Sequence, residues 1–275
     1  MIRAALALVL ALFPFAAAAD PLVVRGDRLF VAADVAGHPV EALLDSAAEL
    51  SFIDRARAAE WKLGAAEAVT ARGSGGEQDA GLIRNVTITA LGVTLSQATV
   101  GVTDLSDVGA RLLGRRLDVI LGHDLFAEAR LAIDIEGGTI ARQERTAPVS
   151  GIELPVSGHD GIDSIPVRIA GKTVQADFDL GNGGGPLISK ALVAALGLQP
   201  VGLEPGGGIG GAISTEIYYL PELELGGVRF PRLRARLDPH GNAGPLNIGV
   251  SLLRRFLIVT DLGQRKIWLA PRPRG

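Results

Sequence analysis

The sequence predicts an all-β fold made of two similar lobes, each carrying short helices. The first reason is an internal duplication, in which the segment Val35–Asp45 recurs at an offset of 134 residues. The second is composition, because 36 glycines and only 4% aromatic residues are typical of many short strands joined by tight turns. Two repeats are too few for an open solenoid, so a closed pair with pseudo-symmetry is expected.

Residues 1–19 have the pattern of a secretion signal peptide. Arg3 supplies a positive charge, Ala4–Phe15 is apolar, and Ala17–Ala19 provides a cleavage site of small residues. The apolar stretch is shorter than the roughly 20 residues that a membrane-spanning helix needs, and no later run reaches that length. We therefore expect a mature protein that begins near Asp20, has no stable membrane anchor and is exported to the periplasm or the extracellular space.

The charge balance and the cysteine content exclude several classes of protein. The 27 basic and 30 acidic residues nearly cancel, so no footprint for nucleic acid is expected. There are no cysteines, which rules out disulfides and an anchor attached through cysteine. The four histidines are scattered, and without cysteine to join them no metal site is expected. We expect a monomer without metal or cofactor, held together by its apolar core.

The duplicated segment predicts a hairpin in each half. Val35–Asp45 matches Ile169–Asp179 in pattern, with an apolar strand, a turn at Gly37 or Gly171, and a second strand that runs into an aspartate. Each half therefore presents one aspartate at the end of an apolar strand.

A short helix follows each aspartate in the prediction. Asp54–Gly64 matches Ser189–Gly197. Asp or Ser at the first position accepts the free N–H groups of the first turn, and glycine at the last position accepts the left-handed closing turn. The prediction therefore closes the first helix at Gly64 and the second at Gly197.

The ends of the two halves also agree, and they divide the chain. Ile120-Leu121-Gly122 recurs 127 residues later as Asn247-Ile248-Gly249. Farther on, Gly137-Gly138 and Leu262-Gly263 occupy the places where a tight turn would join the last two strands of each half. Residues 143–163 are polar and rich in proline and glycine. The sequence thus predicts a first lobe over residues 20–142, a linker over 143–163 and a second lobe over 164–275.

Two duplicated motifs carry a resemblance to a known family. The first is an apolar strand that runs into Asp-Ser/Thr-Gly, present as Leu43-Leu44-Asp45-Ser46-Ala47 and as Phe178-Asp179-Leu180-Gly181. The second is the short apolar segment downstream, which ends at Gly122 or Gly249. With this order and spacing, the chain resembles the pepsin-like and retropepsin-like aspartic peptidases over nearly all of its mature length.

The resemblance implies that Asp45 and Asp179 form a catalytic pair. Like charges a few ångströms apart cannot both ionise, so such a pair shares one proton. One carboxylate activates a water, and its protonated partner polarises the scissile carbonyl of a peptide or protein substrate. This chemistry needs neither metal nor cofactor.

Further residues receive roles only through the resemblance. In the family, the middle Ser or Thr of each triplet hydrogen-bonds to the opposite loop, which gives Ser46 a bracing role. Ala47, Gly181, Gly122 and Gly249 stand where the family has its supporting glycines. A glycine-bearing hairpin in the family also folds over the bound peptide. The candidates for such flaps are Gly73, Ser74, Gly75, Gly76, Gly207 and Gly208, with ordinary hairpin turns as the alternative for each.

Three departures from the family pattern bear on activity. Leu180 lacks the hydroxyl that its place requires, so the second loop is expected to lose its half of the bracing. Ala47 replaces glycine, which is harmless unless that position needs a positive φ. Asp177 lies two residues before Asp179, where the first half has Leu43, and its charge is expected to raise the proton affinity of the pair.

Taken together, these features predict an exported aspartic-type endopeptidase. The alternative is a catalytically silent peptide-binding module with the same fold, favoured by the three departures. A structural β protein of the cell envelope is a third interpretation.

Overall fold

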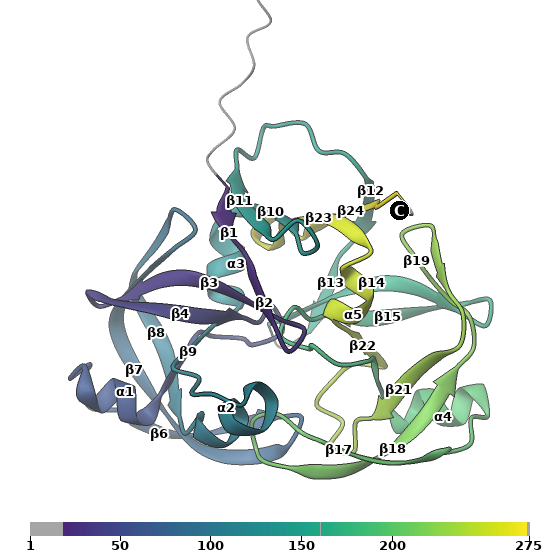
Figure 1. Ribbon diagram of the computed structural model, residues 1–275, viewed down its shortest axis with the longest axis horizontal. Helices are drawn as coiled ribbons and strands as arrows, with labels where there is room; N and C mark the ends of the chain where they lie inside the picture. The colour runs from purple at the N-terminus through teal and green to yellow at the C-terminus, as the bar shows by residue number, and fades with distance from the viewer. Residues whose placement is uncertain (1–18, 160, 274–275) are drawn as a thin grey trace, which may run out of the picture.

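The computed structural model describes residues 19–159 and 161–273 and confirms a mostly β fold with two similar lobes and short helices (Figure 1). The predicted signal peptide, residues 1–19, lies outside the described residues except for Ala19. In Figure 1 the first half of the chain forms the left lobe and the second half forms the right lobe. A sheet shared by both halves lies above them.

The first lobe is built on an eight-stranded sheet. In sheet order, its strands are β2 (Val23–Arg25), β3 (Arg28–Val35), β4 (His38–Leu44), β9 (Val119–Leu121), β5 (Phe52–Asp54), β8 (Val93–Thr103), β7 (Gly76–Ala90) and β6 (Glu67–Gly73). β3 also pairs with β7, which curls the sheet back on itself. The parallel pairing of β4 with β9 places the end of β4 at the centre of the molecule.

The second lobe repeats this arrangement on its own sheet. Its strands, in sheet order, are β17 (Gly202–Gly206), β18 (Ile213–Leu220), β21 (Leu233–Leu237), β16 (Leu187–Ile188), β22 (Leu246–Ile248), β15 (Lys172–Phe178), β14 (Ile162–Ile169), β19 (Leu223–Leu225) and β20 (Val228–Phe230), with β13 (Ser157–His159) paired to β14. β15 and β22 pair in parallel, as β4 and β9 do in the first lobe.

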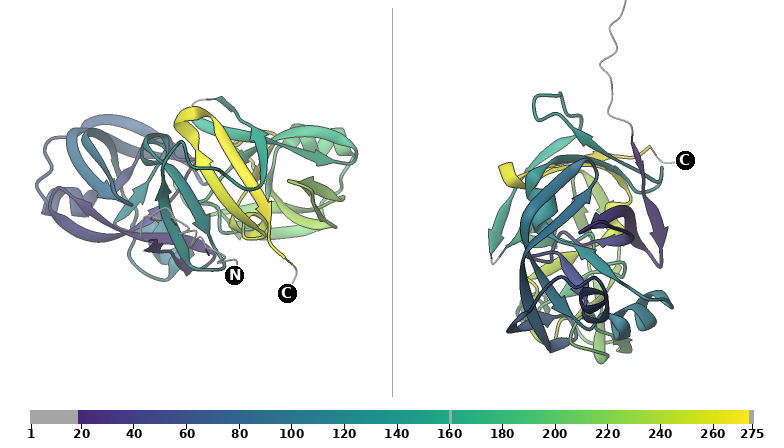
Figure 2. Two further views of the ribbon diagram at one scale, coloured as in Figure 1. Left: turned by 90° about the horizontal axis from the view of Figure 1, so that it is seen from above. Right: turned by 90° about the vertical axis from the view of Figure 1, so that its left-hand side faces the viewer.

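A third sheet, the inter-lobe sheet, joins the halves. Its strands, in order, are β1 (Asp20–Pro21), β11 (Thr139–Gln143), β10 (Arg130–Asp134), β23 (Phe256–Asp261), β24 (Lys266–Pro271) and β12 (Ile152–Pro155). The two halves meet where β10 pairs antiparallel with β23. Seen from above, β23 and β24 run between the lobes (Figure 2). The tight turns predicted between the last two strands of each half join β10 to β11 and β23 to β24.

The predicted linker, residues 143–163, is not a simple connection. It contains β12 and β13, and β14 begins at Ile162, before the predicted start of the second lobe. β12 is the counterpart of β1, because Asp20 pairs with Ile140 and Leu154 pairs with Ile267 at the offsets of the duplication. Since an unpaired sheet edge leaves backbone N–H and C=O groups without partners, each outer edge of the inter-lobe sheet receives one such strand.

Ion pairs across the inter-lobe sheet follow the same pseudo-symmetry. Asp261 on β23 is fully buried and pairs with Arg130 of the first lobe at 3.2 Å and with Arg145, just after β11, at 3.1 Å. In the reverse direction, Asp134 on β10 pairs with Arg272 after β24. Each half therefore anchors a carboxylate of the other, and a buried carboxylate paired with two guanidinium groups is costly to separate.

Short helices occur in both halves. They are α1 (Arg55–Glu60), α2 (Ser106–Leu113), α3 (His123–Glu128), α4 (Lys190–Leu196), α5 (Val250–Leu253) and the 3-10 turn η1 (Leu262–Gln264). α1 and α3 of the first half lie at places equivalent to α4 and α5 of the second, and α2 has no second-half counterpart among the described residues. α4 starts and ends as predicted, since the Ser189 hydroxyl accepts the Leu192 N–H and Gly197 closes the helix with a φ of 63°.

The end of α1 corrects the prediction that Gly64 closes this helix. α1 ends at Glu60, and Lys62 adopts the left-handed conformation, with a φ of 55°. The Leu63 N–H then bonds to the Ala58 carbonyl at 3.1 Å, which completes the closing turn before the glycine is reached. A non-glycine residue accepts this conformation here because the closing hydrogen bonds compensate its cost.

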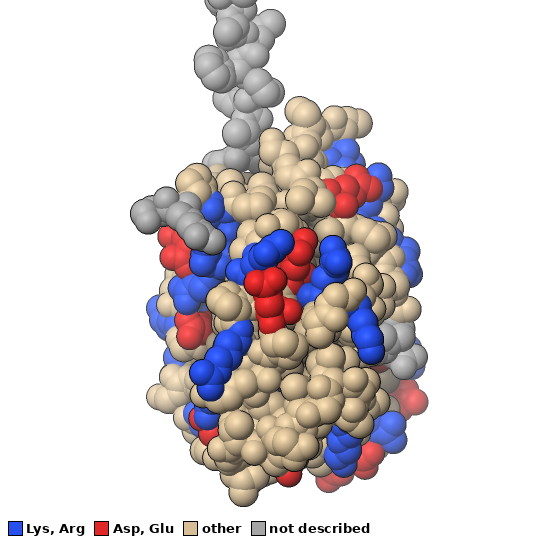
Figure 3. All heavy atoms as spheres, turned by 90° about the vertical axis from the view of Figure 1, so that its right-hand side faces the viewer, with Lys and Arg blue, Asp and Glu red and all other residues tan. Residues whose placement is uncertain are grey.

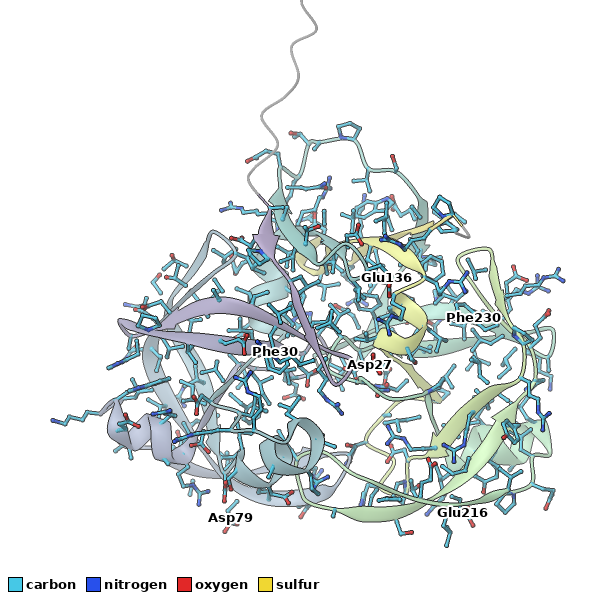
Figure 4. All side chains as sticks on the ribbon, in the orientation of Figure 1. Asp27, Phe30, Asp79, Glu136, Glu216 and Phe230 are labelled. Carbon is cyan, nitrogen blue, oxygen red and sulfur yellow. The ribbon has the colours of Figure 1, made fainter. Side chains whose placement is uncertain are left out.

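The core consists of aliphatic and aromatic side chains inside the lobes. One large cluster extends through both halves, and a smaller one in the first lobe consists of Phe30, Leu43, Leu105, Val108, Leu117 and Ile120. Phe30 and Phe230, labelled in Figure 4, mark the interiors of the first and second lobes. In the described part of the chain, no helix combines the length and apolar character that crossing a membrane requires.

Charged side chains of both signs are mixed on the outer end of the second lobe. Figure 3 shows acidic groups lying among basic ones on this face rather than in a field of one sign. Pairs such as Arg229 with Glu222 belong to this exposed surface.

Candidate active site

Asp45 and Asp179 occupy equivalent places on the two lobes. Each follows directly after a strand, β4 or β15, and its N–H bonds to a carbonyl of the neighbouring parallel strand. The distance is 2.9 Å from Asp45 to Leu121 and 3.0 Å from Asp179 to Ile248. Both side chains line one cleft of about 650 Å³ between the lobes. The topology therefore brings together two aspartates that lie 134 residues apart in the chain.

The segments that end at Gly122 and Gly249 pack directly against the aspartate loops. A Cβ atom added at Gly122 would lie 2.3 Å from the Leu50 carbonyl oxygen, and one at Gly249 would lie 2.0 Å from that of Asn182. The φ angles are −95° and −121°, so the backbone is not in the left-handed region. These glycines are required by close approach, since any side chain would push the loop that carries the aspartate.

The two carboxyl groups interact directly. Burial, followed by the negative charge of Asp179, raises the pKa of Asp45 from 3.8 to about 8, and a hydrogen bond between the two carboxyl groups acts in the same direction. Such a bond needs a proton between the groups, because two carboxylates repel each other. The pair therefore holds one proton at neutral pH.

Asp179 is the better stabilised of the two as a carboxylate. Burial raises its pKa, but hydrogen bonds to its charged form oppose that effect. The Asn247 amide donates at 2.7 Å, and the N–H groups of Gly181 and Asn182 donate at 2.8 Å and 3.0 Å. Asp45 also receives backbone hydrogen bonds, from the N–H groups of Ala47, at 3.0 Å, and Ala48, but no side-chain amide donates to it among the described residues. We therefore assign the shared proton to Asp45 and the negative charge to Asp179.

Asn247 is a site residue whose role the sequence analysis missed. The Asn182 amide donates to the Asn247 side-chain oxygen at 2.8 Å, which turns the Asn247 amide towards Asp179. Its counterpart in the first half is the apolar residue Ile120, so the two halves differ here. A polar residue in a motif that is otherwise apolar was the signal that could have identified it.

Gly181 leaves room for the Asp45 carboxyl group. A Cβ atom added at Gly181 would lie 2.3 Å from the Asp45 carboxyl carbon. Neither Gly181 nor Ala47 has a positive φ. The alanine at position 47 is therefore not strained, and its replacement of the family's glycine is harmless to the backbone.

Ser46 braces the opposite loop, and Leu180 does not reciprocate. The buried Ser46 hydroxyl donates to the Phe178 carbonyl at 2.7 Å and accepts the Leu180 N–H at 3.0 Å. The Leu180 side chain is fully buried in the large core cluster. One half of the bracing is present and the other is replaced by apolar packing.

Asp177 is fully buried near the pair. It accepts hydrogen bonds from the Ser164 hydroxyl at 2.7 Å and from the Gly244 N–H at 2.6 Å, so its burial is compensated. Its negative charge is among the causes that raise the pKa of Asp179, as the sequence analysis expected.

The two flap candidates meet over the cleft. The first is the turn Gly73–Gly76 that joins β6 to β7, and the second is the glycine-rich loop 206–211 that follows β17. The Gly75 N–H bonds to the Ile209 carbonyl at 2.9 Å. A Cβ atom at Gly75 would lie 2.2 Å from the Gly211 oxygen, so glycine permits this backbone contact.

Side chains hold both flaps in this closed position. Arg111 on α2 donates to the carbonyls of Gly207 and Gly208 at 2.9 Å and 3.0 Å. The Asn242 amide donates to the Gly73 carbonyl at 2.7 Å. Gly73, Ser74, Gly207 and Gly208 line the cleft together with the aspartates, so these turns form its roof.

Comparison with known proteins agrees with this geometry. A family model described as aspartyl protease matches residues 31–125 and 165–252. The matched residues cover more than half of the chain and include both aspartates and both glycines of the crossing segments. No curated protein matches the chain significantly.

The shared proton predicts a specific dependence of stability on pH. The folded protein keeps a proton on Asp45 that the unfolded chain releases above pH 3.8, so the free energy of unfolding should fall as pH rises from about 4 to about 8. Asp45→Asn imitates the protonated group and should be more stable than the wild type at pH 8, with the difference vanishing near pH 3. Urea denaturation at a series of pH values measures this.

Asp79, which is exposed on β7 and labelled in Figure 4, offers the matched control. Asp79→Asn should leave the slope of stability against pH unchanged. If the free energy of unfolding changes with pH in the same way for the wild type and for Asp45→Asn, Asp45 does not hold the proton.

Proposed function

The chain belongs to the aspartyl protease family, and on this premise we propose that it is an exported endopeptidase that hydrolyses peptide bonds with a water molecule activated by Asp45 and Asp179. The observation that carries the proposal is the hydrogen-bonded pair of carboxyl groups in the cleft between the lobes. The Asp-Ser-Ala and Asp-Leu-Gly triplets differ from the family pattern, but each aspartate keeps the N–H donors of its loop.

The unequal surroundings of the two aspartates support a division of roles. Asp179 accepts a proton from the attacking water, while protonated Asp45 donates its proton to the carbonyl oxygen of the scissile bond. The proton on Asp179 then passes to the leaving nitrogen as the C–N bond breaks. A hydroxyl of the intermediate returns its proton to Asp45 as the new carboxyl group forms. Each aspartate ends in the protonation state in which it began.

The shape of the cleft supports an extended peptide as the substrate. Residues of both lobes line it, and the turn Gly73–Gly76 and the loop 206–211 roof it. The hydrogen bond between Gly75 and Ile209 closes this roof, so a peptide chain enters only after the flaps separate. Glycines at the contact permit that change of backbone conformation.

A catalytically silent peptide-binding module remains the second candidate. The specific observation in its favour is the one-sided bracing, because only Ser46 crosses to the opposite loop. Small displacements of reacting groups reduce catalysis steeply, whereas binding tolerates them.

Replacement of either aspartate separates the two candidates. Asp45→Asn removes the acid and Asp179→Asn removes the base, so each should lower turnover of a cleaved peptide by roughly 10²- to 10⁴-fold while the protein stays folded. Asp79→Asn on the exposed surface is the control and should keep full turnover. Cleavage of a diverse peptide pool, followed by mass spectrometry, is the measurement. Retention of peptides without cleavage by the wild type would support the binding module, and substantial turnover by either Asn variant would rule out the pair mechanism.

Leu180→Thr tests whether the missing bracing limits the rate. By the pseudo-symmetry of the loops, a hydroxyl at position 180 would lie near the backbone of Leu44 and Ser46, as the Ser46 hydroxyl lies near that of Phe178 and Leu180. Turnover should rise, while the loss of buried apolar surface should lower stability by about 1–3 kcal/mol. Leu180→Val removes similar packing without a hydroxyl and is the control. If Leu180→Thr melts lower and cuts no faster than Leu180→Val, the leucine serves only the core.

Export rests on the pattern of residues 1–19, and mass spectrometry of the secreted protein tests it. Cleavage after Ala19 should give a product that begins at Asp20. Asp20 pairs with Ile140 at the edge of the inter-lobe sheet, so this cut would leave the first strand intact. A secreted product that still carries Met1 would contradict the prediction.

A further inference from the structure

The two sides of the cleft differ chemically. On the first-lobe side, Leu43 and Ile120 belong to an apolar cluster against which Ile209 of the second flap packs. At the equivalent places of the second lobe, the parallel pair β15–β22 carries Asp177 and Asn247 instead. An extended peptide would therefore meet an apolar surface on one side of the scissile bond and a polar one on the other.

Arg236 is the most exceptional residue of the polar side. It pairs with Leu187 in the parallel contact of β21 with β16, where the first lobe has Gly101 paired with Phe52. The duplication has thus placed a guanidinium where the other lobe has no side chain. Arg236 is half-buried and lines the cleft. Among the described residues, no carboxylate pairs with it, although its neighbour Arg234 pairs with Glu204.

Arg28 brings a second guanidinium to the same end of the cleft. It is the first residue of β3 and follows Asp27, which is labelled in Figure 4. Arg254 of the second lobe donates to Asp27 at 3.0 Å. One of the Arg28 Nη atoms donates to the Gly26 carbonyl at 3.0 Å. Arg28 is half-buried and lines the cleft, and among the described residues it has no carboxylate partner within ion-pair distance.

A run of three glycines, 183–185, packs closely against both arginines. A Cβ atom at Gly183 would lie 3.0 Å from Arg28 Cγ, and one at Gly184 would lie 2.3 Å from an Arg236 Nη atom. Burial, and then the charge of Arg236, lowers the pKa of Arg28, whereas the charges of Asp179, Asp45 and Asp27 act against this shift. Burial also lowers the pKa of Arg236, and the charge of Glu204 opposes it. Two charged groups that are partly desolvated and repel each other would be stabilised by an anion between them.

We propose that Arg28 and Arg236 bind a carboxylate of the peptide substrate, from an acidic side chain or from a free C-terminus, beside the glycine run 183–185. This rests on the proposed function, because it assigns a substrate class to the same cleft. Guanidinium groups match carboxylates through paired N–H···O bonds. The two arginine charges also offset those of Asp177 and of the singly protonated pair, so an acidic peptide is not repelled from the aspartates.

Matched peptides test this substrate class. Each pair carries Glu or Gln at one position near a cleaved bond, and each peptide is made with a free and with an amidated C-terminus. We expect kcat/KM to be roughly ten- to a hundredfold higher for the acidic member of one pair, the range that a charge-assisted hydrogen bond supplies. A preference at a Glu position identifies a side-chain carboxylate, and one seen only with the free C-terminus identifies the terminal group. Equal kcat/KM values in every pair overturn the proposal.

Variants locate the preference on the arginines. Arg236→Gln should bring the ratio of kcat/KM for the acidic peptide to that for the neutral peptide down to about one, and Arg28→Gln should reduce this ratio. Arg236→Lys keeps the positive charge but loses the paired N–H donors of the guanidinium, so the acidic peptide should keep part of its advantage. This variant provides a test if the glutamine variant folds poorly. Arg234→Gln, two residues along the same strand and paired with Glu204, should leave the ratio unchanged. A ratio that survives both glutamine variants overturns the proposal.

A binding measurement separates this inference from the proposed activity. Fluorescence anisotropy of labelled Glu and Gln peptides, measured with Asp45→Asn, reports recognition without cleavage. Tighter binding of the Glu peptide with no cleavage by the wild type supports the arginine site and contradicts the peptidase proposal. Cleavage without any acidic preference contradicts the arginine site alone. If the protein shows no preference for the Glu peptide and no cleavage, both proposals are contradicted.

Discussion

The rest of the structure depends on the interaction between the Asp45 and Asp179 carboxyl groups. Two groups that repel each other when ionised remain in contact only if both backbones are held firmly. Three features hold them. The inter-lobe sheet joins the halves through β10 and β23, Gly122 and Gly249 pack against the two aspartate loops, and the Ser46 hydroxyl bridges to the opposite loop. These three features together keep the two carboxyl groups side by side.

Divergence between the two halves turns this symmetric support into an asymmetric site. Asn247 stands where the first half has Ile120, and its amide donates to Asp179 alone. The pair consequently has one carboxylate with several hydrogen-bond donors and one group that keeps its proton. At the second bracing position the chain has the buried Leu180 in place of a hydroxyl residue, so only Ser46 crosses to the opposite loop.

The roof of the cleft is closed by contacts between the two flaps and by side chains that hold them. Gly75 of one flap and Ile209 of the other meet through their backbones, and Arg111 and Asn242 add side-chain hydrogen bonds. Ile209 also packs against the apolar cluster of the first lobe, so separating the flaps would break hydrogen bonds and expose apolar surface. Opening of the cleft, which the proposed function requires, therefore involves both kinds of contact.

The sequence by itself determined the duplication, the two lobes, the hairpins that end at Asp45 and Asp179, and the crossing segments at Gly122 and Gly249. Each of these depends on local patterns of apolar residues and turn glycines, which a linear comparison detects. Only the tertiary structure decided that β12 completes the inter-lobe sheet and that Lys62 closes α1. It also decided that the Asn247 amide donates to Asp179, and that Arg28 and Arg236 line one end of the cleft. These depend on contacts between residues far apart in the chain, whose partners the order of residues does not reveal.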